Sequence, residues 1–85
     1  MAKEDYSVNK QLGLRIYYLR KEINISQEEL SFRADINKNY LSDLERGVRN
    51  PTLKVLNKIA NGLKVTLSFL FQGIDEEVIN KYGIN

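Results

Sequence analysis

Apolar residues recur along this chain with the three- and four-residue spacing of a helix, and no segment alternates as a strand does. The clearest stripe consists of Leu12, Ile16, Leu19 and Ile23, which share one face of a helix over about residues 9–22. The same spacing predicts helices over about residues 27–34, 38–46, 53–62 and 67–71, with a last turn or two over 75–81. The predicted fold is therefore all-α, with five helices and a short helical tail.

Two short helices joined by a tight turn are predicted in the middle of the chain. Ser26 followed by Glu29 forms a capping box for the first of them. Asp35 is expected in a left-handed turn conformation, which Asp tolerates better than most residues. Asn37 is a favourable N-cap for the second helix, and Gly47 is a typical residue just after a helix end.

The second of these helices presents hydrogen-bonding groups outward. Leu41 and Leu44 are its inward-facing pair. Its outer face carries Lys38, Asn39, Ser42, Asp43 and Arg46. A short helix with a narrow apolar stripe and many polar groups outside suits the major groove of DNA.

Composition narrows the possible functions. The 85 residues make one small domain with no cysteine and no histidine, which excludes disulfides, thiol chemistry and His-based catalysis and argues against a zinc site. Nucleophile motifs and phosphate-binding glycine loops are absent. We therefore expect no enzymatic activity, metal or cofactor, and no small-molecule ligand, because no second domain is present to hold one. A polar N-terminus and the lack of a long apolar run predict a cytoplasmic protein that does not enter the membrane.

Charge is distributed unevenly along the chain. The net charge of +2 says little by itself, but residues 10–22 carry four basic residues against one acid, and residues 72–85 carry three acids against one lysine. This pattern suggests a molecule with a basic side and an acidic tail. An ordinary mixed surface is the alternative.

The segments SQEEL, YLSDLERG and RNPTL, together with the apolar pattern over residues 59–71, resemble the Cro/C1-type (XRE-family) helix-turn-helix domain. The resemblance covers residues 12–71 and implies a five-helix, lambda-repressor-like DNA-binding domain. We place this domain at residues 9–72, between an N-terminal arm (1–8) and a C-terminal tail (73–85). The chain is also similar to the free-standing controller proteins of restriction–modification systems, which are small dimers that bind operators ahead of their own genes.

The chain departs from the family pattern at a few positions. Asp35 and Lys64 stand where glycine is common, Gly62 stands inside a helix where alanine is usual, and Ser31 replaces a usual alanine. Gly62 costs about 1 kcal/mol of helix propensity. These departures leave the fold intact and predict modest stability.

The resemblance implies specific contacts with DNA. Gln27 would donate to a phosphate at a helix N-terminus, Lys38 would read guanine, and Asn39 would pair with adenine. The remaining expected contacts come from Asn37, Tyr40, Ser42, Asp43, Arg46, Arg49 and Asn50. Two roles stay open: the Tyr40 ring either packs under the helix or reaches DNA, and Asp43 either accepts from a cytosine amino group or is held by a nearby arginine.

Two further sets of residues have structural roles in this interpretation. The resemblance implies that Arg20 pairs with Glu45, tying the first helix to the end of the recognition helix. A two-fold dimer interface is expected from the late apolar residues Leu67, Phe69, Phe71, Ile74, Val78 and Ile79. One small core cannot bury all of them, and a dimer sets two recognition helices about 34 Å apart, one turn of DNA. A tail folded back over its own core is the alternative.

The sequence therefore predicts a dimeric, sequence-specific DNA-binding transcriptional regulator, preferably a restriction–modification controller of its own operon, with two dimers on adjacent sites as a further arrangement. A phage-type or chromosomal repressor is the next interpretation. An antitoxin-like protein-interaction module is the rival class, but the many donors on the outer face of residues 37–46 argue against it, because protein interfaces favour aromatic residues.

Overall fold

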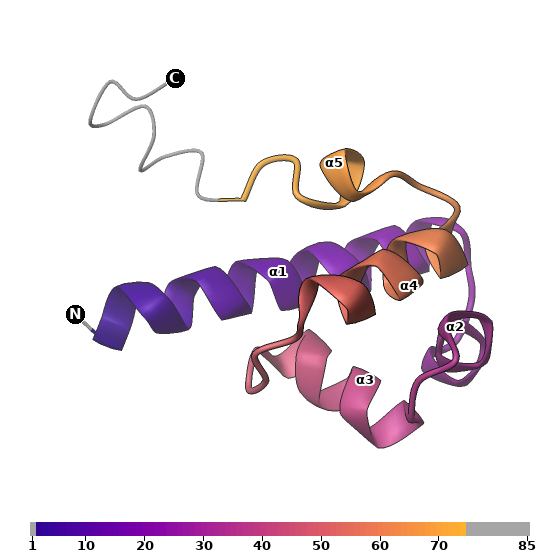
Figure 1. Cartoon of the computed structure of the whole chain (residues 1–85), viewed down its shortest axis with the longest axis horizontal. Helices are drawn as coiled ribbons and strands as arrows, with labels where there is room; N and C mark the ends of the chain where they lie inside the picture. Colours follow the sequence, from indigo (N-terminus) through magenta and orange to yellow (C-terminus); the bar gives the residue numbers. More distant parts are fainter. Residues whose placement is uncertain (1, 75–85) are drawn as a thin grey trace.

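The computed structural model describes the chain over residues 2–74, with side chains from residue 8 onward. Its elements are α1 (Ala2–Glu22), α2 (Gln27–Ala34), α3 (Lys38–Arg46), α4 (Leu53–Leu63) and α5 (Leu67–Leu70). The long α1 runs along one side of the molecule, α2 packs against α4, and α3 packs against α1 and α2 (Figure 1). The predicted all-α fold with five helices is confirmed over this part of the chain.

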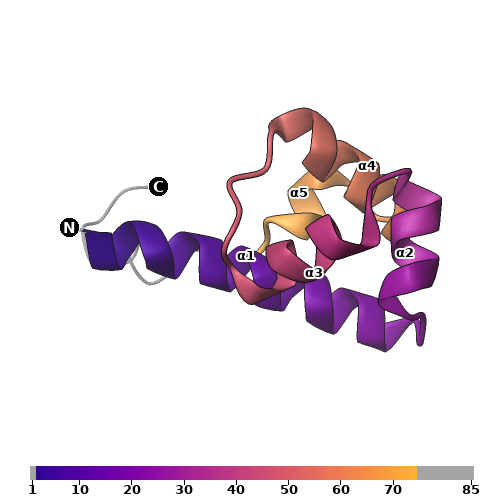
Figure 2. The same ribbon diagram turned by 90° about the horizontal axis from the view of Figure 1, so that it is seen from below.

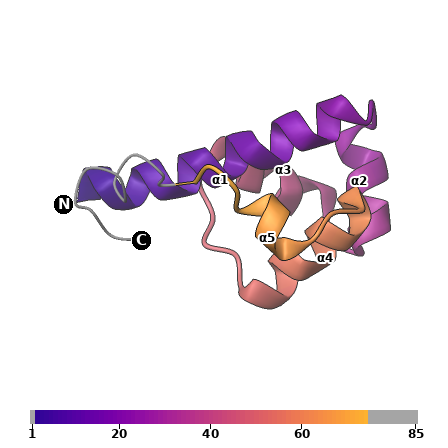
Figure 3. The same cartoon turned by 90° about the horizontal axis from the view of Figure 1, so that it is seen from above.

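The first helix is longer than predicted. It begins at Ala2 rather than near Asn9, so the helix includes described residues that we expected to form an arm. Figures 2 and 3 show its first turns projecting beyond the other four helices. The segment 2–9 contains no glycine or proline to interrupt a helix. None of the described helices is both long and apolar enough to cross a membrane.

Capping residues set the ends of α2 and α3 as the sequence indicates. The Ser26 hydroxyl accepts from the Glu29 amide at 3.0 Å, and Asn37 caps α3. Asp35 and Gly47 end the two helices with φ angles of 55° and 80°. The return half of the capping box differs, because the Glu29 carboxylate accepts from Arg33 Nε at 2.9 Å instead.

The core lies between α1 and the other helices. Its buried apolar residues are Leu12, Ile16, Leu19, Leu30, Ala34, Leu41, Leu44, Leu56, Ile59, Ala60, Leu63 and Leu70. The assignment of two residues to buried apolar faces was wrong: Ile23 is 43% exposed and Leu53 is 64% exposed. Ile23 comes after the last helical residue of α1, and Leu53 opens α4, so neither is held against the core by a full turn of helix on both sides.

Gly62 lies where α4 packs closely against α2. A Cβ atom at this position would lie 3.0 Å from Leu30 Cδ1 and 3.3 Å from Arg33 Cβ. The missing side chain therefore lets α4 approach α2 closely, which offsets part of the helix-propensity cost of about 1 kcal/mol.

Lys64 ends α4 in the left-handed conformation, with φ at 61°. This conformation costs a non-glycine residue about 1–2 kcal/mol, whereas glycine adopts it freely but loses more entropy on folding. We expect Lys64→Gly to raise the free energy of unfolding by about 0.5–1 kcal/mol in urea denaturation. Lys58→Gly, inside the same helix, should lower it by about 1 kcal/mol. A loss of stability in Lys64→Gly would contradict this reading of the turn.

Candidate nucleic-acid interface

One side of α3 is packed against the core, and the opposite side is exposed to solvent. Leu41 and Leu44 are buried, and they hold α3 on α1 and α2. Lys38, Asn39 and Arg46 are exposed on the other side. In Figure 1, α3 lies along the lower edge of the molecule, where a large partner can approach it.

The N-terminal turn of α3 offers several donors. The Asn37 side-chain oxygen accepts from the amides of Asn39, at 2.7 Å, and Tyr40, at 3.2 Å. Because this oxygen is used by the cap, the NH₂ group of Asn37 is the part left for a phosphate. Lys38 and Asn39 project from the same turn, where side chains of a recognition helix reach base edges.

A buried ion pair connects α1 to the end of α3. Arg20 Nε donates to Glu45 Oε2 at 2.7 Å, and Arg20 Nη2 donates to Glu45 Oε1 at 3.0 Å. The two side chains are only 8% and 5% exposed. The hydrogen bonding of Arg20 to the Glu45 carboxylate raises the pKa of Arg20 above its usual value, against the opposing effect of burial. Arg20 Nη1 also donates to the Ile25 carbonyl at 2.9 Å, so the guanidinium fixes the α1–α2 turn as well.

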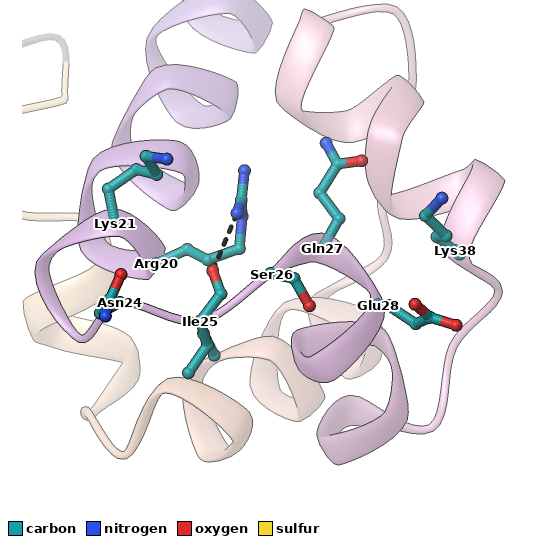
Figure 4. A pocket seen from close by; sticks show the side chains of 8 residues that line it. All are labelled: Arg20, Lys21, Asn24, Ile25, Ser26, Gln27, Glu28 and Lys38. Atoms are coloured by element: carbon teal, nitrogen blue, oxygen red, sulfur yellow. Dashed lines mark hydrogen bonds between the residues drawn. The ribbon is translucent and has the colours of Figure 1, made fainter.

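The same network orients Gln27 at the start of α2. Its Nε2 atom donates to Glu45 Oε1 at 2.9 Å. The side chain stands beside an open groove of about 570 Å³ between the end of α1, the start of α2 and the start of α3 (Figure 4). The groove is lined by Arg20, Lys21, Asn24, Ile25, Ser26, Gln27, Glu28 and Lys38.

Lys21 is a candidate site residue that sequence reasoning did not single out. It lines this groove together with Gln27 and Lys38. The only signal in the sequence was its place in the basic segment over residues 10–22. Two lysines and a helix N-terminus around one groove suit a phosphate group.

Asp43 is held by two arginines. Arg46 Nη2 donates to Asp43 Oδ1 at 2.7 Å, and Arg49 Nε donates to Oδ2 at 3.2 Å. Hydrogen bonds from Arg46 and Arg49 hold the pKa of this carboxyl below its usual value. The sequence left two roles open for Asp43, acceptance from a cytosine amino group or pairing with a nearby arginine. The structure shows the pairing with arginines.

The remaining expected DNA contacts lie around this group. The Arg49 guanidinium stands 5.2 Å from the centre of the Tyr40 ring, and Tyr40 is half-buried against the core. Ser42 is half-buried on α3. Asn50 Oδ1 accepts from Asn9 Nδ2 at 2.9 Å, which ties the loop after α3 to α1. All of the residues expected to contact DNA therefore lie on α3, at its N-cap, in the loop that follows it or at the start of α2.

The late apolar residues form a second surface around α5. Leu67, Phe71 and Ile74 are half-buried against the core, and Phe69 is exposed. Arg15 donates to the carbonyls of Leu70, at 3.2 Å, and Phe69, at 2.6 Å, and its guanidinium lies over the Phe69 ring. The other two expected interface residues, Val78 and Ile79, lie outside the described residues.

Comparisons with known proteins fit this geometry. A helix-turn-helix family model matches residues 16–70, which include the whole of α2 and α3. Control protein C.MunI from Mycoplasma sp is 42% identical over 66 residues, covering 76% of this chain and 89% of that protein. Control protein C.BamHI from Bacillus amyloliquefaciens is 48% identical over 54 residues, covering 62% of this chain and 67% of that protein.

A solved structure has the same fold. The restriction-modification controller protein C.AhdI from Aeromonas hydrophila matches with a TM-score of 0.73 at 33% identity, covering 74% of this chain and 96% of that chain.

Proposed function

The chain belongs to the helix-turn-helix family, and on this premise we propose that it is a dimeric, sequence-specific DNA-binding regulator that controls the operon of a restriction–modification system, its own gene included. The observation that carries the proposal is the exposed donor face of α3, which is held rigidly from behind by buried leucines and the Arg20–Glu45 pair. The relatives described as control and controller proteins support the choice of system. The DNA-binding domain takes in residues 9–72, and we assign the protein no catalytic role.

Phosphate contacts set the register of the protein on DNA in this proposal. Gln27 and the NH₂ group of Asn37 donate to the backbone near the groove at the start of α2, and Arg46 and Arg49 donate at the other end of α3. Tyr40, Ser42 and Asn50 lie between or beside these points and add contacts at the groove edge.

Base contacts come from the first turn of α3. The Lys38 ammonium donates to guanine O6 and N7, and the Asn39 carboxamide pairs with adenine. Both side chains are exposed, so neither must leave the core to reach a base. Contacts of this kind supply about 1–3 kcal/mol of discrimination each.

A second copy of the chain completes the site. The surface around α5 carries the exposed Phe69 with half-buried Leu67, Phe71 and Ile74, and an apolar patch of this kind suits a two-fold interface. Pairing through it would set the two α3 helices to meet successive major grooves about 34 Å apart. Two dimers on adjacent sites are a further step in the same scheme.

The test is a binding titration on the DNA immediately upstream of the gene for this chain, at two salt concentrations. Wild type should bind this fragment tightly, and the affinity should fall as salt rises because bound phosphates release counterions. Lys38→Ala should weaken binding by about 10- to 100-fold while leaving the melting temperature unchanged, since the side chain is exposed.

Lys54→Ala is the matched control, because Lys54 is an exposed lysine on α4 outside the proposed contacts. It should bind like wild type. If both lysine variants weaken binding equally, Lys38 contributes only its positive charge and reads no base. If wild type binds a scrambled fragment as tightly as the upstream fragment, the protein is not sequence-specific.

A further inference from the structure

Asp43 is an acid on the face that is proposed to approach DNA. Its carboxylate is partly exposed and makes hydrogen bonds of 2.7 Å with Arg46 and 3.2 Å with Arg49. The guanidinium of Arg49 is also stacked on the Tyr40 ring at 5.2 Å. Two arginines that suit phosphate binding are therefore already paired with a carboxylate of the protein before any DNA arrives.

We propose that Asp43 is a specificity-determining residue, which restrains Arg46 and Arg49 so that they contact phosphates only when α3 is in register with its operator. This inference rests on the proposed function, because it assigns a role within the same DNA-binding face. Asp43 would weaken binding to non-operator DNA, whereas the residues described above strengthen binding to the operator.

The restraint leaves the arginines able to act in register. An arginine has five N–H donors, and the bonds to Asp43 use one from Arg46 and one from Arg49. The remaining donors can reach phosphates that lie beside the paired side chains. In the operator complex, neither arginine has to leave the carboxylate.

Non-specific DNA presents its phosphates in other registers. A long, free arginine side chain would follow them, and such contacts supply nearly all of non-specific affinity. To do so here, Arg46 or Arg49 must give up a charge-assisted hydrogen bond to Asp43, and phosphate has to compete with the carboxylate for the guanidinium. The carboxylate also cancels one of the two positive charges and repels the DNA backbone, which weakens binding in every register. The competition between Asp43 and phosphate for the arginines is the effect that weakens binding out of register more than binding in register.

The test compares Asp43→Asn with wild type on two duplexes of equal length, the upstream fragment and its scrambled version, over a range of salt concentrations. We expect the variant to bind the scrambled duplex about tenfold more tightly, with a salt slope steeper by about one released counterion. Affinity for the upstream fragment should change by less than about threefold, so the ratio of the two affinities falls.

Glu29→Gln is the matched control. Glu29 pairs with Arg33 at 2.9 Å on α2, and its replacement changes the net charge by the same amount as Asp43→Asn. Binding to the two duplexes should rise slightly and equally in this variant. Both variants should melt close to wild type, because ion pairs as exposed as these contribute little to stability.

Two outcomes would overturn the inference while leaving the proposed function standing. If Asp43→Asn loses affinity for the upstream fragment and not for the scrambled one, Asp43 reads a base. If both affinities rise equally, as in the control, Asp43 acts only as a charge. Failure of wild type to distinguish the two duplexes is a different result, and it would overturn the proposed function together with this inference.

Discussion

Replacing Glu45 with alanine should lower the free energy of unfolding by about 3–5 kcal/mol, as expected when one partner of a buried ion pair is removed. Glu45 accepts three hydrogen bonds, two from Arg20 and one from Gln27. Among the described residues, its loss leaves the guanidinium of Arg20 buried with one hydrogen bond, to the Ile25 carbonyl, and the ring of Tyr17 at 5.4 Å, and with no carboxylate beside it. A small domain has only about 5–15 kcal/mol of stability in total, so urea denaturation should show a large shift of the midpoint.

Glu29→Ala provides the comparison for this prediction. Glu29 also pairs with an arginine, but both side chains are substantially exposed, and such a pair contributes only about 0–1 kcal/mol. The interpretation of the Arg20–Glu45 pair as structural fails if the two variants lose similar stability. It fails as well if a structure of the DNA complex shows Glu45 in contact with a base.

The second large effect is expected at Gly13, where α1 crosses α3. A Cβ atom on Gly13 would lie 2.5 Å from the carbonyl oxygens of both Leu44 and Glu45. These are backbone atoms, so the two helices must move apart to admit a methyl group. We expect Gly13→Ala to lower the free energy of unfolding by about 2–3 kcal/mol even though alanine favours the helix.

Gly62→Ala is the internal comparison for Gly13. There the nearest atom to the new methyl group is the end of the Leu30 side chain at 3.0 Å, which can shift. The gain in helix propensity of about 1 kcal/mol should offset the crowding, so this variant should unfold within about 1 kcal/mol of wild type. A Gly13→Ala protein as stable as Gly62→Ala would show that the α1–α3 crossing is not as tight as described.

Local signals explain why the central helices were predictable. Ser26, Asn37 and Gly47 act on backbone groups within a few residues of themselves, and the structure has each of them at the predicted cap. The predicted start of α1 was wrong because no glycine, proline or strong cap marks the true start. The predicted burial of Ile23 and Leu53 was wrong because the spacing of apolar residues does not show where a helix leaves the core.

Non-local contacts in the site could not be read from spacing. Arg20 and Glu45 are 25 positions apart, and their pairing was expected only from the resemblance to a family. Arg46 bonds Asp43 from three positions along the same helix, but the bond from Arg49 depends on how the loop after α3 folds back, and the role of Asp43 was therefore left open. Gly62 looked like a defect because its neighbours Leu30 and Arg33 belong to another helix.

The most direct test of the central claim is hydroxyl-radical footprinting of the wild-type protein on the DNA upstream of its gene. A dimer that places two α3 helices in successive major grooves predicts two protected patches about one helical turn apart, on one face of the duplex. Lys38→Ala should remove both patches at the same protein concentration. Uniform protection along the fragment, unchanged in the variant, would contradict sequence-specific recognition by α3.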